Sequence, residues 1–155
     1  MSTRVARATV GMLAAVALAG CASGVRDSAG QVTAPATTDS FSVRVGDCLG
    51  KLPSESTDEL TLRPCGESHH WEAFATATLT GEEFPGNAAV RGQAEVACSD
   101  AFAGFVGVPA RKSTLDLTML TPTSQTWTQA HDREVVCLVG SARGDITGTL
   151  AGAAR

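Results

Sequence analysis

Two neighbouring histidines, close to a cysteine and a glutamate, form the stretch whose side chains could do chemistry. Its order is Cys65, His69, His70 and Glu72, and the one other histidine of the chain is His131. Imidazole and carboxylate suit zinc or copper, so one hypothesis is an extracellular metal-binding protein that uses His69, His70 and His131. On a strand, however, His69 and His70 point to opposite faces and could share an ion only through a bend. In the simpler interpretation one histidine hydrogen-bonds to backbone or to Glu72 and the other is exposed. We therefore assign no metal ligand and no cofactor.

Signatures of catalysis are missing from the sequence. It has no Gly-x-Ser-x-Gly, His-Glu-x-x-His, Gly-x-Gly-x-x-Gly or Cys-x-x-Cys motif and no phosphate loop. We assign no catalytic residue and expect a protein that is not an enzyme, with an unrecognised hydrolase of envelope polymers as a second alternative. Trp71 and Trp127 could stack on a glycan, but in a chain with 5% aromatic residues two tryptophans are more often core residues.

The N-terminal residues predict export and a lipid anchor. Arg4 and Arg7 precede an apolar run over 8–19, and Leu18-Ala-Gly-Cys21 closes it. This is the layout of a secretory signal, and the last four residues match a bacterial lipobox, in which the cysteine thiol carries diacylglycerol. An ordinary secretory signal is the alternative. A transmembrane helix would need about 18 or more apolar residues. We expect a palmitate-bearing lipoprotein on the outer face of the cytoplasmic membrane, with Cys21 as the lipidated residue.

Charge and cysteine content agree with an extracytoplasmic location. Removal of residues 1–20 would leave 10 basic and 16 acidic residues, a formal charge of −6. Such a chain is a poor partner for nucleic acid or an anionic lipid surface, so its membrane contact should come from the lipid on Cys21. Four further cysteines, an even number in an exported chain, indicate two disulfides; they are Cys48, Cys65, Cys98 and Cys137.

Hydrophobic periodicity predicts an α+β fold: an antiparallel sheet of about five strands with one main amphipathic helix packed on one face. A helix is expected over 87–106, with Asn87 as its N-cap and Gly107 after its end. One face of the longest strand carries Trp71, Ala73, Ala75, Ala77 and Leu79, and we expect the helix to pack there. Residues 121–129 are expected to be a loop. The expected strands are 41–45, 60–63, 70–79, 115–119 and 134–139, the last buried on both faces.

Composition divides the chain into four parts. Residues 1–20 are the signal peptide that is removed, and 40–150 are the folded domain. Residues 21–39 are the lipidated cysteine and a flexible tether, because they hold almost no large apolar side chain. As a flexible chain the tether would hold the domain roughly 25 Å from the membrane. Residues 151–155 are expected to be a frayed tail.

An ordered set of residues over 41–150 resembles the septum formation domain of actinobacterial exported and membrane proteins. The set is Val45-Gly-Asp-Cys-Leu49, Cys65 with His69 and Glu72-Ala-Phe74, Cys98, Pro122, Trp127, Asp132-Arg133, Cys137 and Thr147-Gly-Thr-Leu150. The chain departs from the family pattern at two turns, where Ser68 replaces a proline before the histidine and His131 replaces a glycine before Asp-Arg. The resemblance implies an extracytoplasmic, non-catalytic module of a Gram-positive envelope that is linked by name to septum formation. Together with the anchor, the tether and the missing catalytic signatures, it leads us to expect a module that binds another envelope component, a protein, and has a role in septum formation.

The matched residues have the character of a structural motif, comprising Asp47, His69, Glu72, Trp127, Asp132 and Arg133. Glu72 and Arg133 carry opposite charges on neighbouring expected strands and could pair. The four cysteines allow three pairings. Because Cys48 ends the first expected strand and Cys65 follows the second, we predict Cys48–Cys65. The remaining Cys98–Cys137 bridge would then join the helix to the most buried strand.

Overall fold

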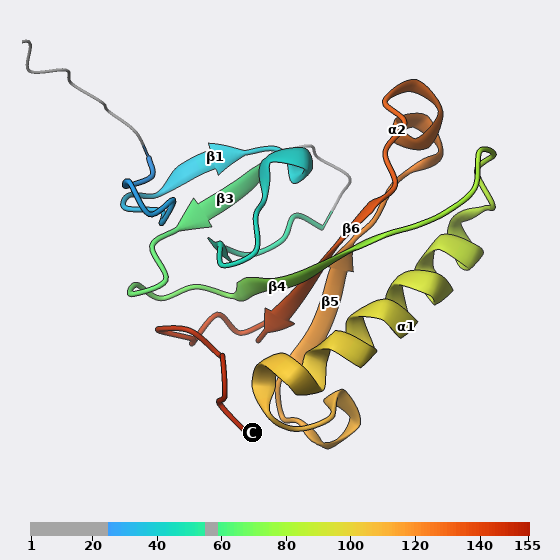
Figure 1. Ribbon diagram of the computed structural model, residues 1–155. Coiled ribbons are helices and arrows are strands. Elements are labelled where there is room, and N and C mark those ends of the chain that lie inside the picture. The colour runs from blue at the N-terminus through green and yellow to red at the C-terminus, as the bar shows by residue number, and fades with distance from the viewer. Residues whose placement is uncertain (1–24, 55–58) are drawn as a thin grey trace, which may run out of the picture.

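A computed structural model describes residues 25–54 and 59–155, and six strands in it form one antiparallel sheet with a long helix across one face (Figure 1). The strand order in the sheet is β1-β3-β2-β4-β6-β5. The α+β fold predicted from the sequence is confirmed, with six strands where about five were expected. The strands are β1 Ala36–Thr38, β2 Cys48–Leu49, β3 Leu60–Arg63, β4 Trp71–Thr78, β5 Asp116–Leu120 and β6 Glu134–Gly140.

The main helix, α1 (Asn87–Val106), has the bounds that the sequence predicts. Its buried residues recur every four positions and pack on β4, β5 and β6. The prediction of Asn87 as the N-cap is wrong, because Gly86 occupies that position and the helix has no side-chain cap there. Gly107 ends the helix as predicted: its φ is 96° and its N–H donates to the carbonyl of Ala103. A positive φ of this kind is typical of glycine at a helix end.

The sheet carries an apolar core on each face. The α1 face buries Phe74, Phe102 and Trp127, and the opposite face, enclosed by β1, β2 and β3, buries Leu49, Leu62 and Trp71 among others. Residues Val135 to Val139 of β6 alternate between the two cores and are at most 3% exposed, which confirms the prediction of a central strand. Figure 1 shows β1 and β3 turned away from α1, so that the sheet curls.

A register shift in β4 makes the predicted helix-facing row wrong at one end. The shift lies between Ala73 and Ala75, where β4 pairs with β6. Trp71 and Ala73 belong to the core on the curled side, whereas Phe74, Ala75 and Ala77 belong to the core under α1. A bulge adds a residue to one strand and so changes which side chains share a face.

Two further predictions are corrected by the structure. Residues 41–45 are not a strand, because Ser40–Ser42 form a 3-10 turn, η1. Of the three apolar residues in this range, Phe41, Val43 and Val45, Val43 alone is buried. Phe41 and Val45 are 56% and 55% exposed, so the alternation did not mark a core face. The expected loop 121–129 contains a short helix, α2 (Ser124–Gln129), which a capping box between Thr123 and Thr126 begins.

The described segments on either side of the predicted domain pack more closely than predicted. The flexible tether over 21–39 is wrong for its described part, 25–39, because β1 pairs with β3 and Arg26 forms a bridge with Val32. The frayed tail over 151–155 is also wrong, since the N–H groups of Gly152 and Ala154 donate to carbonyls of the last turn of α1. Those carbonyls have no partner within the helix, which is the reason the tail is held. The predicted signal peptide and the predicted lipidation site, Cys21, lie outside the described residues.

Two disulfides connect these elements with the predicted pairing. Cys48–Cys65 joins β2 to the turn after β3, and Cys98–Cys137 joins α1 to β6 through the core. A second 3-10 turn, η2 (Ala110–Lys112), follows α1. In the ranges 25–54 and 59–155, no helix combines the length and apolar character needed to cross a bilayer.

Candidate functional site

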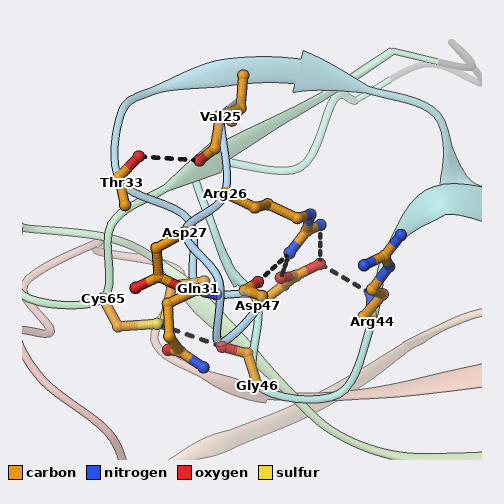
Figure 2. Close-up of polar contacts among 11 residues, drawn as sticks. Val25, Arg26, Asp27, Gln31, Thr33, Arg44, Gly46, Asp47 and Cys65 are labelled. Atoms are coloured by element: carbon orange, nitrogen blue, oxygen red, sulfur yellow. Dashed lines mark hydrogen bonds and ion pairs between the residues drawn. A yellow bond between two sulfur atoms is a disulfide. The ribbon is translucent and has the colours of Figure 1, made fainter. Parts of the chain in front are cut away.

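Asp47 is a buried carboxylate that holds the N-terminal segment against the sheet (Figure 2). Arg26 donates from Nη1 to Oδ1 at 2.5 Å and from Nη2 to Oδ2 at 2.8 Å, and the backbone N–H of Arg44 donates to Oδ2 at 2.8 Å. The hydrogen bond to Asp47 raises the pKa of Arg26 above its ordinary value, against a smaller opposing effect of burial. Arg26 therefore keeps its charge throughout the physiological pH range, and its loss of charge would weaken the ion pair only in strong alkali.

Glu72 holds the C-terminal segment in a similar way. It is 3% exposed and accepts hydrogen bonds from the hydroxyl of Thr149 at 2.7 Å and from the N–H of Leu150 at 2.6 Å. The predicted pair between Glu72 and Arg133 is wrong. Glu72 lies opposite Val139, whereas Arg133 precedes the other end of β6.

Arg133 organises the loop between β4 and α1. Its guanidinium lies over the ring of Trp127, with Cζ 3.7 Å from the ring centroid. It donates to the carbonyls of Gly81 at 2.9 Å, Glu82 at 3.0 Å and Trp127 at 2.9 Å. The planar guanidinium can stack on an aromatic ring and donate several hydrogen bonds at once. Arg133 therefore joins α2 to the loop.

Asp132 completes this arrangement beside α2. One carboxylate oxygen accepts from the hydroxyl of Thr126 at 3.0 Å, and the other accepts from the N–H of Glu134 at 3.0 Å. Asp132 therefore fixes the turn between α2 and β6, and both carboxylate oxygens are bonded within the protein.

The three histidines do not come together. His69 is buried, and its Nδ1 lies 2.9 Å from the carbonyl oxygen of Glu67, so this ring nitrogen is the donor. His70 lies by the end of β6, because its carbonyl accepts from the N–H of Ser141. His131 precedes the start of β6, at the opposite end of the β4–β6 ladder. Among residues 25–54 and 59–155, no group of three or more His, Cys, Asp or Glu side chains could hold a metal ion.

The two tryptophans are core residues of opposite faces of the sheet. Trp71 is 8% exposed in the curled side, and Trp127 is 1% exposed under α1 and donates from Nε1 to the carbonyl of Glu82. They form no common platform for a glycan, and their interpretation as packing residues is the correct one.

The arrangement of these side chains supports positioning more than chemistry. Each of the carboxylates of Asp47, Glu72 and Asp132 is bonded to the protein itself. The cysteines of the described part, Cys48, Cys65, Cys98 and Cys137, are all in disulfides. In the same part of the chain no hydrogen bond joins a serine or threonine hydroxyl to a histidine ring, as a hydroxyl nucleophile and its base would require.

Comparison with protein families matches the chain over residues 8–143 to the family described as Septum formation. The chain belongs to the septum formation family. The matched range begins within the N-terminal apolar run and ends before Thr147–Leu150, which the sequence resemblance had included. Comparisons with curated proteins and with solved structures gave no match. The septum formation family is not a known family of enzymes.

The two positions at which the chain departs from the resemblance lie outside the helices and strands. His131, in the place of the usual glycine, has a φ of 54°, in the left-handed region that glycine adopts without strain. Ser68, in the place of the usual proline, donates its hydroxyl to the carbonyl of Gly144 at 2.8 Å.

Sequence reasoning missed the partners of the two most buried carboxylates. The sequence places Arg26 in the predicted tether, and Thr149 and Leu150 at the end of the predicted domain. The burial of Asp47, beside Gly46 and Cys48, is known only from the structure, so the sequence holds no direct signal of its partner. A buried carboxylate needs a cation or donors, and the two arginines between residues 21 and 47 are Arg26 and Arg44.

Proposed function

We propose that this protein is a lipid-anchored module of the cell envelope that binds another envelope protein and acts in septum formation. The family match over residues 8–143 carries the proposal. The lipobox at Leu18–Cys21 supports an anchor. The carboxylates of Asp47, Glu72 and Asp132 are bonded within the protein, so we assign recognition of a partner to the exposed surface.

The lipid anchor is tested first, with the full chain expressed in its own host. We expect the wild type in the membrane fraction, with a mass increase of diacylglycerol on Cys21 in its N-terminal peptide. Cys21→Ser should lose the modification and be released from the membrane, and Ala22→Ser, a matched change one residue away, should keep both. Membrane association of Cys21→Ser equal to that of the wild type would contradict the anchor.

The septal role is tested with a fluorescent protein fused after Arg155. We expect enrichment of the fusion at septa of dividing cells, and misplaced or delayed septa in a strain that lacks the gene. Crosslinking of intact cells, followed by mass spectrometry, should identify one envelope protein as the partner. Its crosslinked amount should exceed that found with a control lipoprotein of similar abundance. An even distribution of the fusion together with normal septa in the deletion strain would count against this role.

A further inference from the structure

β5 (Asp116–Leu120) is an open edge of the sheet. It pairs with β6 on one side over five residues without a register shift, and it is the last strand in the order. Its sequence, Asp-Leu-Thr-Met-Leu, contains no lysine, no proline and no bulge. Those features usually protect edge strands from pairing with another chain. The other edge, β1, is shorter, with three residues that follow Pro35.

A groove of about 270 Å³ lies between this edge and α1, lined by Arg91, Glu95, Leu117, Thr118, Met119 and Thr121. Leu117 and Met119 are partly buried against the core under α1, and the surface that lines the groove is mostly polar. Arg91 and Glu95 are exposed on α1, one turn apart, and neither takes part in an ion pair within the described residues. The groove thus offers a mostly polar lining with one free cation and one free anion.

The direction of the elements fixes how these charges lie along β5. β5 and β4 both run antiparallel to β6, and α1 returns along the sheet after β4, so α1 is antiparallel to β5 (Figure 1). Four residues of helix advance about 6 Å, which is close to two residues of a strand. A strand laid along β5 would therefore place side chains two positions apart against Arg91 and Glu95.

We propose that the groove between α1 and β5 receives an extended segment of the partner protein, which adds to the sheet as a strand antiparallel to β5. This inference rests on the proposed binding of an envelope protein. The segment carries an acidic residue against Arg91 and, two positions later, a basic residue against Glu95. Backbone hydrogen bonds to an edge strand supply affinity in such complexes, and alternate side chains supply specificity.

A second copy of this chain fits the groove less well than a partner segment of that pattern. Pairing of β5 with β5 of another copy would put its own alternate side chains, Leu117 and Met119, on the α1 side. Both are uncharged, so neither would pair with Arg91 or Glu95. Charge complementarity therefore favours a segment in which an acidic and a basic residue alternate with other residues.

Two short peptides test the proposal on the full chain in detergent micelles. The first is acetyl-Thr-Val-Asp-Val-Lys-Val-Thr-amide, and the second has Asp and Lys exchanged. We expect the first to shift the amide resonances of Leu117–Leu120 and to bind about fivefold more tightly than the second, an advantage that salt reduces. N-methylation of the peptide backbone on the side that faces β5 should abolish binding.

The charge-swapped variant Arg91→Glu/Glu95→Arg provides the matched control, because both residues are exposed on α1. It should reverse the preference between the two peptides while the amide spectrum of the core stays unchanged. Equal binding of both peptides, shifts confined to residues outside β5 and α1, or no shift at millimolar peptide would overturn the proposal. So would a dimer in sedimentation equilibrium that shifts the β5 resonances without peptide. These results are independent of septal localisation, so the failure of one leaves the other standing.

Discussion

Gly140, the last residue of β6, sits where only glycine fits. A Cβ built on it would lie 1.9 Å from the carbonyl oxygen of His70 and 2.9 Å from the Cα of Trp71. Both are backbone atoms of the neighbouring His70–Trp71 segment, so no rotamer change relieves the overlap. We expect Gly140→Ala to lower the free energy of unfolding by about 3 kcal/mol or more, as measured by urea denaturation.

Gly92 gives the matched control in the same experiment. It lies within α1, and a Cβ built there meets nothing within 4 Å. Alanine is a better helix former than glycine, so Gly92→Ala should raise the free energy of unfolding by about 0.5–1 kcal/mol. The added methyl group is thus expected to lower the free energy of unfolding at Gly140 and to raise it at Gly92. Equal changes at the two sites would show that the close backbone approach at Gly140 is wrong.

His131 is held in a backbone conformation that costs it free energy. With φ of 54°, an L-residue is strained by about 1–2 kcal/mol, whereas glycine avoids that strain and loses about 0.5–1 kcal/mol through its freer unfolded chain. We expect His131→Gly to stabilise the protein by about 0.5 kcal/mol, measured by the same denaturation. His131→Ala removes the imidazole and keeps the strain, so it should change little. If His131→Ala stabilised the protein as much as His131→Gly, the stabilisation would come from loss of the imidazole and not from relief of backbone strain.

At the scale of single residues, the sequence predicts the structural role of a side chain better than it predicts the partner to which that side chain bonds. It indicated that Asp47, Glu72 and Arg133 are structural, and each is bonded within the fold. It paired Glu72 with Arg133 because opposite charges on neighbouring strands attract. Position along a strand decides the outcome, and the β4–β6 register sets these residues at opposite ends.

At the scale of elements, the helix α1 was predictable to its bounds, whereas α2 and β1 were not. The period of apolar residues and the glycine that follows mark α1 directly. α2 has one large apolar residue, Trp127, so no period could form, and β1 is Ala-Thr-Thr. Its stability comes from pairing with β3, a tertiary interaction that composition does not reveal.

The two disulfides should contribute unequally to stability. Their sequence separations are 17 and 39 residues, which in the chain-entropy view correspond to about 3 and 4 kcal/mol. Cys98 and Cys137 are also both buried between α1 and β6, so their removal leaves a cavity. We expect Cys98→Ala/Cys137→Ala to lose more free energy of unfolding than Cys48→Ala/Cys65→Ala. A larger loss from the second pair would contradict this order.

At the scale of the whole molecule, the N-terminal segment determines how far the domain can lie from an anchor at Cys21. A flexible tether over 21–39 would allow a gap of roughly 25 Å. The segment from Val25 onward packs on the sheet instead, through β1 and the Arg26–Asp47 ion pair. Only four residue steps separate Cys21 from Val25, which reach at most about 14 Å. The fold therefore places the domain close to the membrane if the proposed lipid is present.

Neutron reflectometry of the lipidated protein on a supported bilayer measures this gap. We expect a layer of protein that begins within about 14 Å of the lipid surface.

Arg26→Ala should loosen the segment and widen the gap, because it leaves the Asp47 carboxylate, whose side chain is 4% exposed, without its cation. It should also lower the free energy of unfolding by about 2–3 kcal/mol, since the N–H of Arg44 still donates to Asp47. Arg44→Ala is the control: the side chain of Arg44 is exposed and its N–H stays in place, so neither quantity should change appreciably. A gap near 25 Å for the wild type, or equal gaps for wild type and Arg26→Ala, would mean that this segment does not hold the domain at the membrane.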